Sequence, residues 1–243
     1  MKRETSHSLD HLVGEQIAKW DRQRIEQKKK AERYSPRPCI TISRDPGSGG
    51  TEVARRLARD LGMDLVGSKI IQQVAERADI SEKVIASLDE KEVRLRDSWL
   101  DSLFRANYMW PDEYVRCLTK VVGTIGKQGH AIIIGRGGQF ILPPAETFRV
   151  RLIAPREVRI RNVMRDSGSD FENAQRYVYQ TEADRNAFLR KHFHADWSDS
   201  IHSDLIVNTG SLGIEGAVTV VKAAFAEWKK HPQAQSADIE KGG

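Results

Sequence analysis

The stretch ISRDPGSGGTEVARRLARDLG, residues 42–62, runs from apolar residues through a cluster of glycines into a helical pattern. A strand that ends in glycines and turns directly into a helix directs several backbone N–H groups at one point, with the positive end of the helix dipole behind them. Glycines 47, 49 and 50 let the backbone adopt left-handed angles and approach an anion closely. The stretch therefore predicts a phosphate-binding loop; a plain tight turn between strand and helix is the alternative.

The loop matches only part of the usual phosphate-binding pattern GxxxxGK[ST]. Gly49 and Thr51 fit, and Thr51 falls where such a loop places the hydroxyl that binds magnesium. Gly50 occupies the lysine position, and Arg44 occupies the position of the first glycine. Because Arg44 is close in sequence, we expect it to lean over the loop and supply the missing charge, with planar instead of point geometry.

Short apolar runs alternate with helical patterns beyond residue 38. The strand candidates are CITIS at 39–43, MDLV at 63–66, HAIIIG at 130–135, FRVRLI at 148–153 and DLIVN at 204–208. Helical patterns cover 51–61, 69–78, 156–166 and 213–228. This alternation predicts one α/β domain over residues 38–228, with a five-stranded parallel sheet covered by helices on both faces.

Three segments lie outside this alternation. In the extension 1–37, apolar residues at three- and four-residue spacing predict an amphipathic helix over 8–33, with a basic segment at its end. That helix is expected to pack on the domain or on a second subunit, which would make a homodimer; binding to a membrane surface is the alternative. Residues 81–128 contain no convincing strand and predict a helical insert, and the polar tail 229–243 is expected to be disordered.

Composition and charge narrow the class of protein. The chain has 243 residues, of which 39% are hydrophobic and 30% charged, as in soluble globular proteins. It lacks both an apolar run of the roughly 20 residues that span a membrane and the apolar centre of a secretory signal, so we expect a cytoplasmic protein. The net charge of +5 is concentrated in residues 21–37, which carry seven basic and three acidic groups. Because this excess does not cover a domain face, nucleic-acid binding is not expected.

A second glycine turn and several arginines follow later strands. The third strand ends in IIIGRGGQF, which places Arg136 and Gly137 at a carboxyl end of the sheet, where open α/β folds bind ligands. Arg136 could hold a second anionic group, or it could be exposed on a turn. APREVRIRNVMRD contributes Arg159, and QTEADRNAFLRK contributes Asp184 and Arg185. Arginines matter because phosphoryl transfer spreads negative charge over the migrating group.

This order of features resembles the nucleoside monophosphate kinases, and most closely the cytidylate kinase-like family. The resemblance covers roughly residues 38–227. It rests on the loop quoted above, KIIQQVAERADIS at 69–81, AIIIGRGGQFIL at 131–142, VRLIAPREVRIRNV at 150–163 and HFHADWSDSIHSDLIVNTGSLGIEGAV at 192–218. The family pattern has a loop of the form SREYGSGG, a GRG turn after the third strand and a DW turn before the last strand. Together these features are specific for the family.

The resemblance implies a P-loop kinase core that uses ATP and Mg²⁺ as donor and cytidine monophosphate (CMP) as acceptor. By position, the donor phosphates would be held by Gly47, Ser48, Gly49, Gly50 and Thr51, with Thr51 binding Mg²⁺ through the nucleotide. Arg136, Gly137 and Asp184 would bind the acceptor, together with the insert at 81–128. Arg159 and Arg185 would be lid arginines that act in catalysis with Arg44.

The sequence supports two hypotheses of function. The first is a kinase that transfers the γ-phosphoryl group of ATP to CMP or a related small acceptor. The second is a catalytically weak or inactive regulatory module that binds a nucleotide or anion and acts through its N-terminal helix. Its basis is Gly50 at the lysine position and Gly67 where the kinase-like family often has an aspartate. ADP release that depends on an acceptor would distinguish the two.

Overall fold

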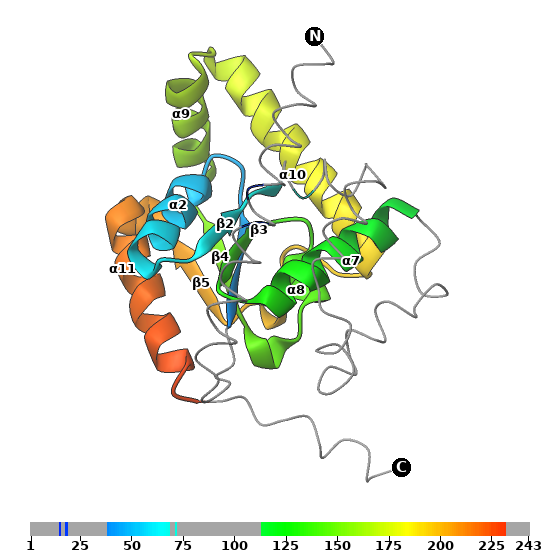
Figure 1. Cartoon of the computed structure of the whole chain (residues 1–243). Coiled ribbons are helices and arrows are strands. Elements are labelled where there is room, and N and C mark those ends of the chain that lie inside the picture. Colours follow the sequence, from blue (N-terminus) through cyan, green and yellow to red (C-terminus); the bar gives the residue numbers. More distant parts are fainter. Residues whose placement is uncertain (1–14, 16–17, 19–37, 69–70, 72–112, 232–243) are drawn as a thin grey trace, which may run out of the picture. The chain divides into compact units, whose positions relative to one another are not determined.

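A computed structural model describes residues 15, 18, 38–68, 71 and 113–231 (Figure 1). The chain divides into two compact units, one of residues 1–37 and 67–129 and the other of residues 38–66 and 130–243. Nearly all of the expected helices at 8–33 and 69–78, most of the insert and the tail beyond 231 lie outside the described residues. The expected dimer contact through the N-terminal helix lies there as well.

The second unit contains one parallel sheet with the strand order β2-β3-β1-β4-β5 (Figure 1). Its strands are β1 (Cys39–Arg44), β2 (Asp64–Val66), β3 (Ala131–Ile134), β4 (Thr147–Ile153) and β5 (Leu205–Asn208). Each lies within one residue, at either end, of a run expected from the sequence. The central strand β1 ends at Arg44, so this residue lies in the middle of the carboxyl edge of the sheet, where ligands of open α/β folds bind.

The helices of this unit are α2 (Gly50–Leu61), α8 (Gly138–Ile141), α9 (Arg156–Ser167), α10 (Phe171–Phe193) and α11 (Thr209–Trp228), with 3₁₀ turns η1 (Pro144–Glu146) and η2 (Ser200–His202). On one face of the sheet, α2 and α11 pack against Ile40 and Ile42 and form the main core. Because strand side chains alternate, Thr41 points to the other face, where Gly138 of α8 lies against it. The expectation of helices on both faces is confirmed.

The other unit contributes one described helix, α7 (Glu113–Gln128). It covers the last third of the insert expected at 81–128 and is helical as expected. Among the residues that the structure describes, no helix is long and apolar enough to cross a membrane.

Helix α10 was not expected from the sequence. It runs antiparallel to α9 and the two form a hairpin at the carboxyl edge of the sheet (Figure 1). Of its 23 residues, Ala174, Val178 and Leu189 are buried, so the sequence shows no broad apolar stripe. One local signal exists: Asp170 caps the helix by accepting a hydrogen bond from the backbone N–H of Asn173 at 2.8 Å.

Helix α11 begins earlier than its apolar pattern indicates. Its first turn starts at Thr209, after Asn208, whose side chain accepts a hydrogen bond from the Gly210 backbone N–H at 2.9 Å. Gly213 then has φ 65° and ψ −179°, which are not helical angles, and the long apolar part follows it. The sequence pattern at 213–228 therefore marks the second part of the helix, and the first turn belongs to the site described next.

Candidate phosphate-binding site

The glycine loop between β1 and α2 has the backbone that the sequence predicts at two of its three glycines. Gly47 and Gly49 have φ values of 79° and 74°, in the left-handed region that favours glycine. Gly49 is the N-cap of α2, and Gly50 is already the first helical residue. The first N–H groups of a helix have no partner within it, so this end of α2 can bind an anion.

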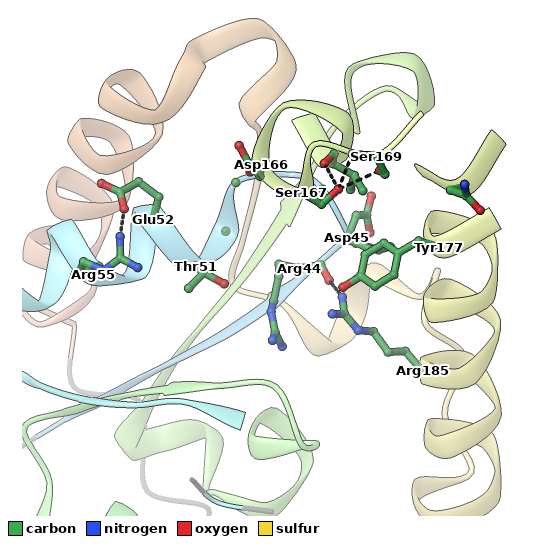
Figure 2. A pocket seen from close by; sticks show the side chains of 16 residues that line it. Arg44, Asp45, Thr51, Glu52, Arg55, Asp166, Ser167, Ser169, Tyr177 and Arg185 are labelled. Atoms are coloured by element: carbon green, nitrogen blue, oxygen red, sulfur yellow. Dashed lines mark hydrogen bonds and ion pairs between the residues drawn. The ribbon is translucent and has the colours of Figure 1, made fainter. Parts of the chain in front are cut away.

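The loop borders a cavity of about 730 Å³ at the carboxyl edge of the sheet (Figure 2). This volume is within the usual range for small-molecule sites. The cavity is lined by residues 44–47 and 49–52 of the loop and α2, by Arg55 of α2, by Val163, Asp166 and Ser167 of α9, by Ser169 of the α9–α10 turn, and by Asn173, Tyr177 and Arg185 of α10. Ser48 is not among the lining residues, since its hydroxyl donates to the carbonyl of Asp45 at 2.8 Å and the residue is buried.

Arg44 lies against Gly50, the residue at the lysine position. A β-carbon built on Gly50 would be 2.6 Å from Cβ of Arg44 and 2.9 Å from its Cγ. Carbon atoms of separate side chains do not approach so closely, so a lysine could not enter this position without moving Arg44. Arg44 also lines the cavity, and its role as a replacement for the lysine stays a prediction.

Positive groups converge on the cavity beside Arg44. Arg185 reaches across from α10 and donates a hydrogen bond from Nη1 to the Arg44 carbonyl oxygen at 2.6 Å, and Tyr177 lies next to both (Figure 2). Burial, with Arg185 and Arg136 nearby, lowers the pKa of Arg44 to about 9. Burial also lowers the pKa of Arg185, and Arg136 contributes to this shift. Like charges held this close repel one another, so an anion bound here would relieve that repulsion.

Arg159 lies behind the loop and does not line the cavity. It is 5% exposed, and its guanidinium donates to the Ala154 carbonyl at 3.1 Å and to Glu182 at 2.9 Å. Its own carbonyl lies so close to Gly47 that a β-carbon there would overlap the oxygen and be 2.9 Å from the carbonyl carbon. The structure thus gives Arg159 a packing contact with the loop, whereas the sequence reading expected a lid arginine that reaches the phosphates.

The residues expected at the acceptor side do not line the cavity either. Arg136 has φ 54°, and its guanidinium lies 6.0 Å from the ring centroid of Phe188. Gly137 has φ 70° and caps α8, with the Phe193 ring in the space that a side chain would need. Asp184 is exposed on α10. Of the three, Arg136 is the one that acts on the pKa values of the cavity arginines.

Three residues that contact the loop were missed as functional residues in the sequence reading. The Asn162 side-chain amide donates to the Gly47 carbonyl at 2.8 Å, and the Thr209 hydroxyl donates to the Ser48 carbonyl at 2.7 Å. The indole N–H of Trp197 donates to a carboxylate oxygen of Asp45 at 3.2 Å. The DW turn was a visible signal for Trp197, but only the folded chain shows what it contacts.

The sequence of this chain is similar to that of a known protein family. The sequence profile of the cytidylate kinase-like family matches residues 39–211, which include all five strands and the glycine loop. The chain belongs to the cytidylate kinase-like family. Similar proteins include the cytidylate kinase of Ignicoccus hospitalis, 28% identical over 184 residues, which are 75% of this chain and 96% of that protein. The cytidylate kinase of Methanopyrus kandleri is 27% identical over 204 residues, covering 79% of this chain and 95% of its own.

A solved structure of an uncharacterized protein from Eubacterium ventriosum has the same fold. It superposes with a TM-score of 0.60 at 20% sequence identity, over 78% of this chain and 99% of the other. At this identity the likeness concerns the fold alone. The fold expected from the sequence, a five-stranded parallel sheet with helices on both faces, is confirmed for this member of the cytidylate kinase-like family.

Proposed function

We propose that the protein is a nucleotide kinase that transfers the γ-phosphoryl group of ATP to CMP or a related small acceptor. The observation that carries the proposal is the meeting of Arg44 and Arg185 with the N-terminus of α2 around one cavity. Each of these groups favours an anion, and the loop glycines let a phosphate chain approach the backbone. Membership of the cytidylate kinase-like family supports CMP as the acceptor.

Within this proposal, the donor phosphates lie along the loop from Gly47 to Thr51. The backbone of the loop and the first turn of α2 hold the β- and γ-phosphates, while Arg44 supplies the charge that a lysine gives in other loops of this kind. Thr51 is exposed at the second position of α2 and lines the cavity, so its hydroxyl is available to the Mg²⁺ that accompanies ATP. Magnesium neutralises charge on the donor phosphates when it is bound.

The chemical step needs positioning and charge neutralisation more than a strong base. An oxygen of the acceptor phosphate attacks the γ-phosphorus, the bond to the β,γ-bridging oxygen breaks, and ADP leaves. Arg185 is placed to neutralise charge on the migrating group, because it extends from α10 to the end of β1. Arg136 remains the arginine that we propose on the acceptor side. Gly137 and Asp184 remain proposed acceptor-binding residues on the basis of the sequence resemblance.

The test is ADP release by the full chain with ATP, Mg²⁺ and a panel of CMP, dCMP, UMP, AMP and GMP. We expect release that depends on the acceptor and is fastest with a cytidine nucleotide. Thr51→Val should lose most of this activity, and Thr51→Ser should retain it, because serine keeps the hydroxyl. ATP binding without turnover for any acceptor would reject the kinase and favour the alternative, a regulatory module that binds nucleotide.

A further inference from the structure

The DW turn lies far from the loop in sequence and touches it in the fold. Trp197 is in the turn between α10 and η2, and its indole N–H donates to Asp45, the first residue after β1. The acceptor carboxylate is nearly buried, with a side-chain exposure of 12%. A hydrogen bond to a charged group contributes more than one between neutral groups, so this partly buried contact restrains the Asp45 side chain.

Asp45 uses its other polar groups to shape the loop. Its backbone N–H donates to the Leu152 carbonyl at 2.9 Å, which extends the pairing of β1 with β4 beyond the last strand residue. Its carbonyl accepts two bonds from Ser48, one from the backbone N–H at 3.2 Å and one from the hydroxyl at 2.8 Å. The orientation of Asp45 therefore decides how the chain turns toward Gly49 and α2.

Arg151 of β4 contacts Trp197 through both its ring and its backbone. Its guanidinium carbon lies 5.2 Å from the centroid of the Trp197 ring, and Nη1 donates to the Trp197 carbonyl oxygen. The same guanidinium lies 4.0 Å from the Asp45 carboxylate and is 13% exposed. The three side chains thus form one compact group, with Asp45 facing the cavity and Trp197 and Arg151 behind it.

From this geometry we infer that Trp197 is a positioning residue of the phosphate-binding loop: its indole N–H holds Asp45 and so fixes the loop in the conformation that binds the phosphates of ATP. The inference deepens the proposed function and rests on it for the identity of the ligand. Trp197 does not line the cavity, so it acts through Asp45 and not by touching the nucleotide.

Trp197→Phe is the direct test, because phenylalanine keeps an aromatic ring for Arg151 and removes only the N–H donor and the second ring. Trp228→Phe is the matched control. The Trp228 side chain packs with Phe148 and Phe225, and its indole N–H has no hydrogen-bond partner within the described part of the chain. Both variants make the same chemical change to a partly buried tryptophan, but only one of them removes a contact with the loop.

The first measurement needs no nucleotide. In a ¹H–¹⁵N spectrum of the full chain, the indole signal that disappears in Trp197→Phe is expected to shift as Asp45 titrates, and the Trp228 signal is expected to stay constant. The groups that face Asp45 are Arg151, Arg159 and Arg185, which favour its charged form, and Glu182, which opposes it. In Asp45→Asn the Trp197 indole signal should no longer shift with pH. Glu182 remains in that variant, so this loss would assign the shift to Asp45. If the chemical shift of the Trp197 indole signal changed neither with pH nor in Asp45→Asn, the inference would be overturned.

The second measurement is ATP affinity by calorimetry, with melting temperature recorded alongside. We expect about tenfold weaker ATP binding in Trp197→Phe, and no change in Trp228→Phe, if the loop depends on this hydrogen bond. Asp45→Ala removes the acceptor of this hydrogen bond, so Trp197→Phe should have little further effect on ATP affinity in the Asp45→Ala background, since both substitutions then act on one contact. Equal ATP affinity in Trp197→Phe and the wild type would reject the positioning role. Failure of the wild type to bind ATP would instead reject the proposed function, and the spectroscopic test of the contact would still decide whether Trp197 holds Asp45.

Discussion

Gly50 and Arg44 share one space in this protein. Because a β-carbon on Gly50 would lie 2.6 Å from Cβ of Arg44, a side chain at one position excludes the present side chain at the other. The missing lysine and the arginine at the end of β1 are therefore two parts of one arrangement. In the proposed site, the positive charge comes from the strand that precedes the loop and not from the helix.

Exchanging the two residues tests this relationship. Gly50→Lys alone should lower both the melting temperature and ATP affinity, because the new side chain collides with Arg44. Arg44→Gly alone should weaken ATP binding by about tenfold or more through loss of a charged contact. The double variant, with lysine at 50 and glycine at 44, should bind ATP more tightly than either single variant by calorimetry. Tighter binding by Gly50→Lys alone would contradict the shared space.

Gly47 can be compared with Gly168, since both have a positive φ, of 79° and 67°. A β-carbon added at Gly168 would have no neighbouring atom within 4 Å. Gly168→Ala should therefore lower the free energy of unfolding only by the backbone strain, about 1–2 kcal/mol. An alanine at Gly47 meets the backbone of Arg159 as well, and should lower the free energy of unfolding by roughly 2 kcal/mol more. Urea denaturation measures both. Equal losses in the two variants would mean that α9 moves away from the loop without cost.

Arg159 and Arg185 should respond differently to the same substitution. Arg159→Met breaks an ion pair in which only the arginine is buried and removes the donor to the Ala154 carbonyl, so we expect a loss of stability of about 1–2 kcal/mol. Arg185→Met should lower kcat by at least tenfold with a smaller loss of stability, because Arg185 lines the cavity. Thermal unfolding and steady-state kinetics separate the two effects. An unchanged kcat in Arg185→Met would remove it from the proposed mechanism.

Asp45 gives the protein a predictable dependence on pH. Burial raises the pKa of its carboxyl above the usual value, although Trp197, Arg159 and Arg151 oppose the shift. The folded state then binds the proton more tightly than the unfolded state, so this group costs stability at neutral pH and the cost disappears as pH falls toward the usual carboxyl pKa. Asp45→Asn should therefore be more stable than the wild type at pH 7, and the difference should shrink as the pH falls toward the usual carboxyl pKa. If urea denaturation showed Asp45→Asn to be less stable than the wild type at pH 7, the Asp45 carboxylate would stabilise the fold, contrary to this prediction.

The sequence predicted those parts of the site that depend on local pattern. Apolar runs and glycines placed the five strands and the loop, because strand burial and left-handed angles have strong local signals. It did not predict α10, in which Ala174, Val178 and Leu189 are the buried residues of a 23-residue helix. A helix held by so few contacts leaves almost no periodic pattern to read.

The direction of each arginine was also beyond the sequence. Arg159 and Arg185 lie on the two helices after β4 and both looked suited to the phosphates, yet Arg159 turns toward Glu182 and Arg185 toward the end of β1. Which way a side chain turns is decided by partners that come from other elements. For the same reason, Trp197 was part of a recognised pattern whose contact with Asp45 could not be inferred.

The contacts that shape the loop come from late in the chain. Three hydrogen bonds join the loop to residues 115, 152 and 161 positions further along the chain. They are Gly47 with Asn162, Asp45 with Trp197 and Ser48 with Thr209. During synthesis, a chain that has not yet emerged as far as Thr209 cannot complete these bonds, although the glycines themselves have long been made. The closure of such long loops is slow, so the loop should be among the last parts to become native. Nucleotide binding by a ribosome-bound chain would then indicate that the domain has been translated through the start of α11.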